Sequence, residues 1–264
     1  GAQLVEGMIG YPVISTVSSA GVRVHEIDGE AEAAKRIVPT SVGSPREIAE
    51  LLDRELADGG CAVVIRNTVR EAQETYDAVK AVFGREQTTL LHSRFLAAER
   101  AARDRRLLEL FGKNAGRRPR RHVVVATQVI EQSLDVDFDL MLTDPAPMDL
   151  ILQRIGRLHR HERADRPVGL RKARCLVLVE DLFAVPWAYS TGTDHVYPRH
   201  AVLRTLGILA DRGEIMVREP VDYAKLTALA YSDVEAVGPA QWAGAFDTAL
   251  DERERSTAQS RMRA

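Results

Sequence analysis

The sequence predicts an α/β protein built on a parallel β-sheet with helices on both faces. Short apolar runs alternate with longer helical patterns from residue 44 to residue 179, and this alternation is typical of a parallel sheet. The runs CAVVI and CLVLV are apolar throughout rather than at every second residue, as expected for strands that are buried on both faces. From about residue 186 a loop-like stretch and three helical stretches follow.

The elements follow one another in a regular order. A hairpin is predicted over residues 11–27, because two strand-like runs flank Ser-Ser-Ala-Gly. Helices are expected to begin at Ser44 and at Thr68, since each is a good N-cap and a glutamate follows three residues later. Another helix is expected up to about Phe111, and a further one over 148–160 from its apolar spacing. The predicted strands are 61–66, 88–91, 122–127, 138–143 and 173–179.

We predict two domains, an α/β domain over 1–185 and a smaller, mostly helical domain over 186–264. Cys61 and Cys175 each open an apolar run, so we interpret them as small buried side chains rather than as disulfide or metal ligands. Free thiols are typical of a reducing compartment, so a cytoplasmic protein is expected. No apolar stretch approaches the ~18 residues of a membrane span, so no membrane association is expected.

The charge is unevenly distributed along the chain. The net charge is only −2, yet residues 85–121 hold eleven Lys/Arg against four Asp/Glu, and residues 150–174 hold eight against two. Two basic blocks in a nearly neutral chain indicate a surface patch for an anionic partner.

Polar side chains follow the predicted strands, at the point where each strand ends. In an open parallel sheet the carboxyl ends of the strands form one edge, where ligands bind. A row of donors at such an edge suits a nucleic-acid backbone, and the scarcity of aromatic residues there disfavours a platform for base stacking. The candidate contacts are Asn67, Thr68, His92, Arg94, Thr127 and Gln128.

The segment QRIGRLHRH over 153–161 places three arginines and two histidines between two apolar segments. On the predicted helix, Gln153, Arg157 and Arg160 are four and three residues apart, so they are expected to share one face. Two converging guanidinium groups suit a triphosphate. A solvated charged face is the simpler alternative. No metal site is expected, because His159 and His161 have no accompanying ligand set.

These segments together resemble the motifs of a superfamily-two helicase. Residues 153–160 carry the Gln-x-x-Gly-Arg-x-x-Arg spacing of motif VI, and 123–139 are similar to motif V. VIRNTVREAQ resembles motif IV, and LLHSRF resembles the motif that follows it. The residues around motifs V and VI look most like the CRISPR-associated helicase-nuclease of type I systems. The resemblance covers 61–161 and implies a second RecA-like domain, followed by an accessory domain that covers single-stranded DNA.

The resemblance also implies roles for individual residues. Gln153, Arg157 and Arg160 are expected to face the γ-phosphate of ATP, with the two arginines as arginine fingers. Asp135 is expected near the same nucleotide, which it would couple to the DNA site. The row of donors named above is expected to hold single-stranded DNA. The implied cofactor is ATP with Mg²⁺, shared with a first RecA-like domain, and the implied partner is a Cascade-like guide-RNA surveillance complex.

Several motifs of an intact motor are missing from this sequence. There is no Gly-x-x-x-x-Gly-Lys-Ser/Thr, no Asp-Glu-x-His/Asp and no adjacent His-Asp pair, so the phosphate cradle, the magnesium carboxylates and the nuclease chemistry have to come from elsewhere. We therefore expect half of a motor, whose first RecA-like domain and nuclease domain lie upstream or on a separate chain. The chain alone is expected to be inactive. The alternatives are a helicase unconnected with CRISPR and a non-catalytic nucleic-acid-binding module.

Overall fold

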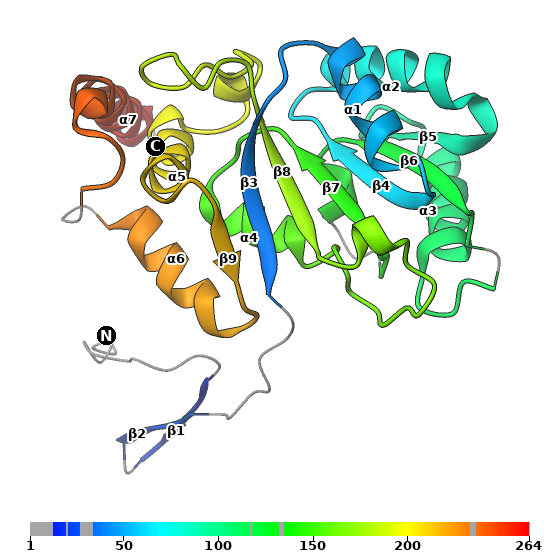
Figure 1. The fold of residues 1–264 in the computed structure, drawn as a ribbon. Helices are drawn as coiled ribbons and strands as arrows, with labels where there is room; N and C mark the ends of the chain where they lie inside the picture. The colour runs from blue at the N-terminus through cyan, green and yellow to red at the C-terminus, as the bar shows by residue number, and fades with distance from the viewer. Residues whose placement is uncertain are drawn as a thin grey trace.

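The computed structural model describes residues 13–19, 21–26, 34–116, 118–131, 135–232 and 236–263. Its main body is a seven-stranded sheet (Figure 1) with the strand order β5-β6-β4-β7-β8-β3-β9. The strands are β3 (Lys35–Ser41), β4 (Gly60–Ile65), β5 (Thr88–Leu91), β6 (Arg121–Ala126), β7 (Leu140–Thr143), β8 (Arg174–Val179) and β9 (Ile215–Val217). All neighbouring strands are parallel except β3 and β9, which are antiparallel.

The predicted parallel sheet and its five predicted strands are confirmed, and the structure adds β3 and β9. β3 contains Pro39, which argues against an internal strand because proline has no N–H to donate. Successive amides of a strand point to opposite neighbours. The amides of Arg36 and Val42 donate toward β8, so the nitrogen of Pro39, at an odd position, faces the side of β9. There β9 pairs only with Lys35–Ile37, and Pro39 lies beyond its end. The missing donor therefore interrupts no ladder bond.

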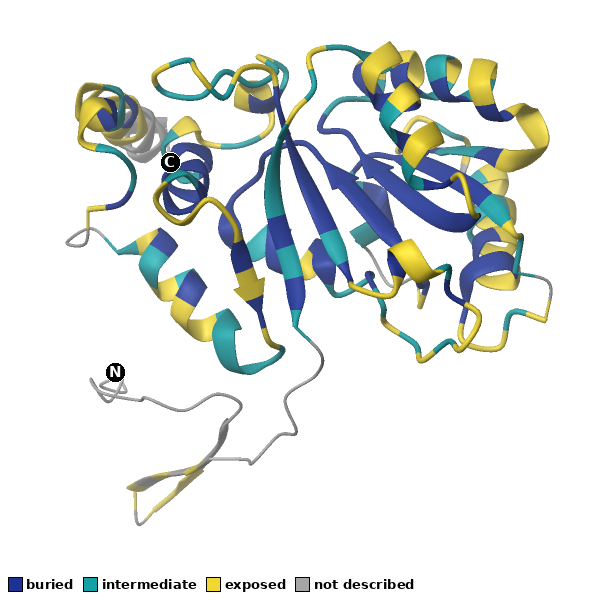
Figure 2. Cartoon of the chain, viewed as in Figure 1, coloured by how far each residue is buried: buried dark blue, intermediate teal, exposed yellow. Residues whose placement is uncertain are grey.

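Helices cover both faces of the sheet, as predicted. The helices are α1 (Pro45–Glu55), α2 (Val69–Phe83), α3 (Ala97–Phe111), α4 (Met148–Ile155), α5 (Arg199–Arg212), α6 (Val221–Tyr231) and α7 (Ala243–Arg263). Ala62 and Val64 of β4 pack with α1 and α2, whereas Val63 and Ile65 pack in a second cluster with α3, α4 and α5. Alternate residues of one strand thus serve two cores, which explains the unbroken apolar run. Figure 2 shows β4 as buried along its length.

The predicted N-caps of α1 and α2 are confirmed. Ser44 accepts a hydrogen bond from the Glu47 amide, and Thr68 forms a complete capping box with Glu71. The box predicted for α1 is incomplete, because the Glu47 carboxylate accepts from the Gly43 amide instead of the Ser44 amide. Both helices therefore start where the sequence places them.

The N-terminal hairpin is confirmed over 13–18 and 21–26, the paired residues, while 11, 12, 20 and 27 lie outside the described residues. The buried thiols are also confirmed. β1 (Val13–Ser18) pairs antiparallel with β2 (Gly21–Glu26) in a separate two-stranded sheet. Cys61 and Cys175 are free and fully buried. Burial raises the pKa of both thiols to about 12, so neither is a thiolate at neutral pH.

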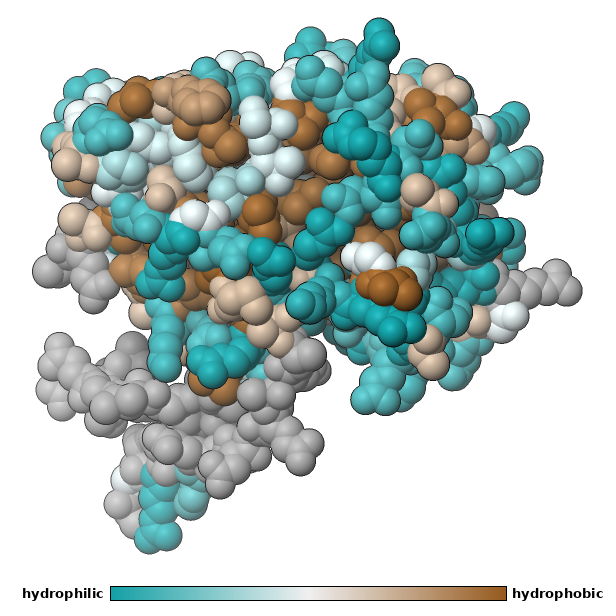
Figure 3. Space-filling model, viewed as in Figure 1, coloured by the Kyte–Doolittle hydropathy of each residue, from teal (hydrophilic) through white to brown (hydrophobic). Residues whose placement is uncertain are grey.

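The C-terminal part of the chain is mostly helical, as predicted, and it also completes the sheet. β9 comes from this part, and Trp242 and Leu206 lie in the same hydrophobic cluster as strands β4 and β8. The division into domains at residue 185 stays a prediction. On the face shown in Figure 3, hydrophobic residues occur in small groups among hydrophilic ones. Within the described part of the chain, no helix combines the length and apolar composition needed to span a membrane.

The helix predicted over 148–160 is too long, and this prediction is corrected. α4 ends at Ile155, with Gly156 as its C-cap. The residues that follow pair with the segment before β7, since the Phe138 amide donates to Arg157 O and the His159 amide donates to Phe138 O. These bonds take the backbone groups that a longer helix would use. His159 has a left-handed φ of 49°, which turns the chain away from the helix axis.

Candidate functional site

The carboxyl edge of the sheet brings the predicted nucleic-acid residues together. They follow β4, β5 and β6, which are adjacent in the sheet. Backbone hydrogen bonds continue past the ends of the strands, from the Thr127 amide to Leu91 O (3.0 Å) and from the Arg66 amide to Ala126 O (2.8 Å). The predicted row therefore exists as a continuous edge, although its members differ in how accessible they are.

Asn67 and Thr68 have their side chains committed to internal hydrogen bonds. The Asn67 amide nitrogen donates to Pro145 O (2.7 Å) and to Thr193 Oγ1 (2.9 Å), and its side chain is buried. The Thr68 hydroxyl donates to Glu71 Oε2 (2.6 Å) and accepts from the Glu71 amide. Their predicted contact with DNA stays a prediction, and their observed role is to shape the edge.

His92, which is predicted to contact DNA together with Arg94, is buried. Its ring stacks on Phe95 with centroids 4.1 Å apart, and Arg103 covers the same phenyl ring at 3.9 Å. Nδ1 of His92 accepts from the Arg94 amide (3.2 Å). Burial, and then the charge of Arg103, lowers the pKa of His92, so the neutral imidazole supports a turn that exposes Arg94.

Thr127 and Gln128 begin the segment that connects this edge to the arginines. Thr127 is buried, whereas Gln128 is half-buried and donates from Nε2 to Asn67 O (2.9 Å). The short helix η2 (Gln128–Glu131) follows. Residues 132–134, which belong to the segment similar to motif V, lie outside the described residues.

Gln153, Arg157 and Arg160 do not share a helix face, because only Gln153 lies within α4. Arg157 and Arg160 extend instead from the turn that follows it. Gln153 and Arg160 are exposed and Arg157 is half-buried. The two arginines are therefore placed by a turn that is hydrogen-bonded to Phe138 and not by helical periodicity.

Arg160 forms a surface ion pair with Asp135, Nε to Oδ1 at 2.6 Å. The hydrogen bond from Arg160, despite some opposition from burial, lowers the pKa of Asp135. Nε2 of His161 lies 3.2 Å from the same carboxylate oxygen. Both partners of the ion pair are substantially exposed, at 40% and 50% of their side-chain surfaces. Exposed pairs contribute at most about 1 kcal/mol, so a phosphate can compete for Arg160.

Arg157 has one side-chain donor without a hydrogen-bond partner among the residues that the structure describes. Its Nη2 donates to Glu131 O (3.1 Å), while its buried Nε has no partner among the described atoms. Burial, and then the nearby charge of Arg160, lowers the pKa of Arg157, but a guanidinium stays protonated in proteins. A half-buried cation with a donor that has no partner among the described atoms is suited to bind an anionic ligand.

Two buried aspartates fix the turn that carries these arginines. Asp137 accepts from the Arg160 amide (2.9 Å) and pairs with Arg163 and Arg166. Asp139 accepts from the Cys61 amide (2.7 Å) and also pairs with Arg166. The sequence interpretation missed both residues, because buried ion pairs between distant positions leave no local pattern.

Arg154 is a further residue that the sequence interpretation missed. It lies within QRIGRLHRH, yet it is fully buried and donates to Glu131 Oε1 at 2.7 Å. A signal was available: Arg154 lies three residues after Ile151 and four after Leu150, so it shares the helix face of these apolar residues.

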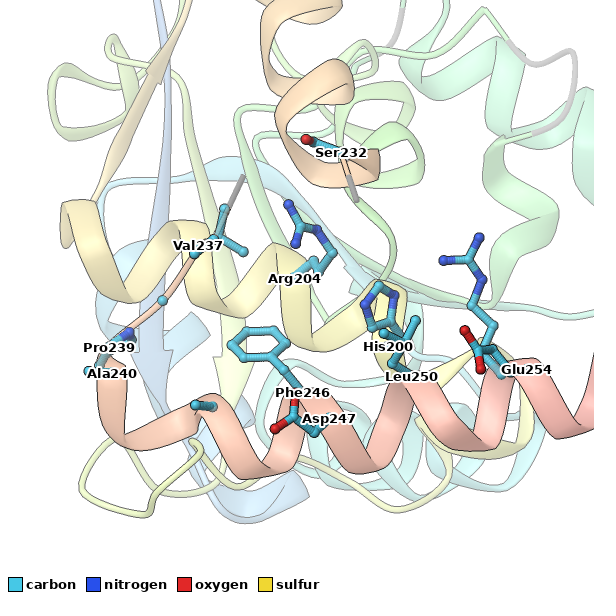
Figure 4. A pocket seen from close by; sticks show the side chains of 14 residues that line it. His200, Arg204, Ser232, Val237, Pro239, Ala240, Phe246, Asp247, Leu250 and Glu254 are labelled. Carbon is cyan, nitrogen blue, oxygen red and sulfur yellow. The ribbon is translucent and has the colours of Figure 1, made fainter. Parts of the chain in front are cut away.

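Elsewhere, a pocket of about 780 Å³ lies between α5 and α7 (Figure 4). Phe246 and Leu250 of α7 line it together with Arg204 of α5. None of the residues predicted for ATP or DNA lines this pocket. In the described ranges no group of three or more His, Cys, Asp or Glu side chains is arranged to hold a metal ion.

The chain is similar to one family over its central segment. A family model described as CRISPR-associated nuclease/helicase Cas3, C-terminal, matches residues 58–163. The Cas3 nuclease/helicase of Streptococcus thermophilus is 35% identical over 224 residues, 84% of this chain. The Cas3 endonuclease/helicase of Escherichia coli K12 is 33% identical over 219 residues, 81% of this chain. The chain spans 23% and 24% of these two relatives, about a quarter of their length.

Solved structures extend the similarity to nearly the whole chain. A CRISPR-associated protein is 35% identical with a TM-score of 0.82, covering 96% of this chain and 28% of its own. The T. fusca Cas3–AMPPNP structure is 31% identical with a TM-score of 0.79, covering 93% of this chain and 30% of its own. The order of the motifs, the fold and these relatives agree. The chain therefore carries the C-terminal helicase domain of the Cas3 family.

Proposed function

We propose that this chain is the C-terminal half of an ATP-dependent motor that moves along single-stranded DNA in CRISPR interference. In this proposal Arg157 and Arg160 are arginine fingers that complete an ATP site, while Gln153 and Asp135 contact the same nucleotide. The ATP and its Mg²⁺ are held mainly by a first RecA-like domain. Arg94, Thr127 and Gln128 contact the DNA backbone, with Asn67, Thr68 and His92 beside them.

One observation carries the proposal: Arg157 is half-buried and charged, its Nε has no partner among the described residues, and it lies close to the exposed Arg160–Asp135 pair. Phosphoryl transfer spreads negative charge over the γ-phosphate oxygens, and arginines placed there stabilise it. Relatives from T. fusca were solved as Cas3-AMPPNP, Cas3-ATP and Cas3-ADP, which supports a nucleotide as the anion.

The identity of the partners also has support from a relative. A structure that is 30% identical to this chain is a CRISPR RNA-guided surveillance complex in a pre-nicking state. We therefore propose a guide-RNA surveillance complex as the partner that delivers DNA to the motor. The same relatives favour a CRISPR helicase over a helicase of another pathway.

The test measures DNA-stimulated ATP hydrolysis by the intact motor, in which this chain and its ATP-binding partner domain are both present. Arg157→Ala should lower kcat by roughly 10³-fold, because the finger acts mainly on the transition state. Single-stranded DNA should still bind the variant. Arg171→Ala, which removes an exposed arginine outside the turn, is the matched control and should keep the wild-type rate. Full activity of Arg157→Ala would contradict the proposed role.

The chain alone should hydrolyse no ATP and cut no DNA. ATP turnover by the isolated chain that disappears with Arg157→Ala would show that the site is complete without a partner domain. A non-catalytic binding module is the competing function. It predicts salt-dependent binding of single-stranded DNA and a motor ATPase that is insensitive to both Arg157→Ala and Arg160→Ala.

A further inference from the structure

Arg154 occupies the centre of the site without reaching its surface. It is fully buried on α4, between the exposed Gln153 and the turn that carries Arg157. A buried guanidinium requires several partners, because an unpaired charge is costly to desolvate. The partners that Arg154 uses come from segments that are far apart in the sequence.

One branch of these contacts leads to the proposed ATP finger. Arg154 Nε donates to Glu131 Oε1 at 2.7 Å. The carbonyl oxygen of the same glutamate accepts from Arg157 Nη2 at 3.1 Å. Glu131 therefore contacts both arginines at once, one through its side chain and one through its backbone.

A second branch leads to the proposed DNA edge. Arg154 Nη2 lies 3.4 Å from Asn67 Oδ1, at the long limit of a hydrogen bond. The Asn67 carbonyl accepts from Gln128 Nε2 at 2.9 Å. Gln128 and Glu131 are the first and last residues of η2, so this short helix is held at both ends through Arg154.

A third branch reaches the C-terminal part of the chain and the end of β7. Arg154 Nη2 donates to the Tyr197 hydroxyl at 2.9 Å, and Nη1 donates to Thr143 Oγ1 at 2.6 Å. The guanidinium group is planar and presents its donors in a fixed fork. A shift of one acceptor therefore changes the geometry of the others, and a buried network of this kind is stronger when all its members are in place.

We propose that Arg154 is a positioning residue that couples the DNA edge to the ATP finger. Single-stranded DNA that binds against Gln128 fixes the position of η2. The contact between Arg154 and Glu131 then fixes the position of Arg157. This inference rests on the proposed function. Arg154 itself touches neither ligand.

The test compares steady-state ATP hydrolysis by the intact motor with and without saturating oligo(dT). Arg154→Lys keeps a positive charge for Glu131, but a single ammonium cannot reach the separated acceptors. We expect the stimulation ratio, the rate with oligo(dT) over the rate without it, to fall by about tenfold, a typical coupling energy between sites. The Kd for oligo(dT) should stay near the wild-type value.

The matched control is Arg204→Lys. Arg204 is another buried helix arginine, and it donates to the backbone oxygens of Ala230 and Leu229, away from the site. It should lower the melting temperature without changing the stimulation ratio. Tyr197→Phe removes one hydroxyl from the network and should lower the ratio by a factor of about 3, within the range for single sites in a coupled network. If Arg154→Lys does not fold, the stimulation ratio of Tyr197→Phe tests the coupling role instead.

Three outcomes overturn the coupling role. The ratio of Arg154→Lys could equal that of the wild type. The stimulated and unstimulated rates could fall in the same proportion, as a purely structural residue predicts. If Arg154→Lys does not fold, a wild-type stimulation ratio in Tyr197→Phe would also overturn the coupling role. The proposed function is judged separately by Arg157→Ala, and a wild-type motor without DNA-stimulated ATPase would overturn it and this inference together.

Discussion

At the residue scale, burial decides what each polar side chain can do. Arg154, Arg157 and Arg160 are three residues apart, yet the first is fully buried, the second half-buried and the third exposed. Only the last two can meet a ligand. The same distinction separates Arg94, which is exposed, from His92, which is buried in a ring stack beneath it.

His122 gives a pH dependence that can be measured on the chain itself. The imidazole is buried on β6, and Thr89 Oγ1 lies 2.9 Å from its Nε2. Burial, and then the charge of Arg106, lowers its pKa to about 4. The unfolded imidazole has a pKa near 6.5. Between these values the unfolded chain binds the proton and the folded chain does not, so stability is complete above the higher value and falls as the pH decreases.

We expect His122 to account for about 2 kcal/mol of the stability lost between about pH 7.5 and about pH 5. Urea unfolding of the wild type and of His122→Asn at both values measures the difference. His122→Asn should lose less stability than the wild type between the two pH values. His195→Asn, which removes an exposed histidine, should behave like the wild type. Equal losses in the wild type and His122→Asn would mean that folding does not lower the pKa of His122.

At the element scale, local signals place the start of a helix better than its end. Ser44 and Thr68 start α1 and α2 through hydrogen bonds within three residues, which the sequence alone contains. The end of α4 depends on Phe138, which lies far from Gly156 in the sequence and takes the backbone groups of 157 and 159. The apolar residue Leu158 continues the helical spacing but is buried through that pairing.

The capping box of α2 allows a test of whether Thr68 acts only as an N-cap. Thr68→Ala should lower the free energy of unfolding by about 1 kcal/mol, because the Glu71 amide loses its acceptor. Thr68→Ser keeps the hydroxyl and should restore the stability. Chemical unfolding measures the effect, and binding of single-stranded DNA by the same variants shows whether Thr68 also contacts DNA. A loss of stability without a loss of binding would limit Thr68 to its role as a cap.

At the scale of the whole molecule, the C-terminal part shares its core with the sheet. Lys35, at the start of β3, donates to Ile155 O (3.2 Å) and to Glu219 Oε1 (2.9 Å), which connects α4 to residues after β9. Trp242 lies in the same hydrophobic cluster as the sheet. A shared core favours unfolding of both parts together.

The two tryptophans, Trp187 and Trp242, both lie in the predicted C-terminal domain, which provides a test. Tryptophan fluorescence reports on this part alone, whereas far-UV circular dichroism reports on all helices and strands. The two unfolding curves in urea should coincide, with one midpoint. A fluorescence midpoint at lower urea than the dichroism midpoint would support separate domains over 1–185 and 186–264.

The sequence by itself determined the alternation of strands and helices, the five predicted strands and the caps of two helices, because these depend on residues close together in the chain. Its motif spacing also predicts Gln153, Arg157 and Arg160 as site residues, and this stays a prediction. Only the tertiary structure decided that Arg157 and Arg160 extend from a turn, that Arg154 is buried with contacts to both Glu131 and Asn67, and that β9 completes the sheet. The physical reason is the same in each case: Phe138, Glu131 and β3 are distant in sequence, and their hydrogen bonds outweigh the local pattern.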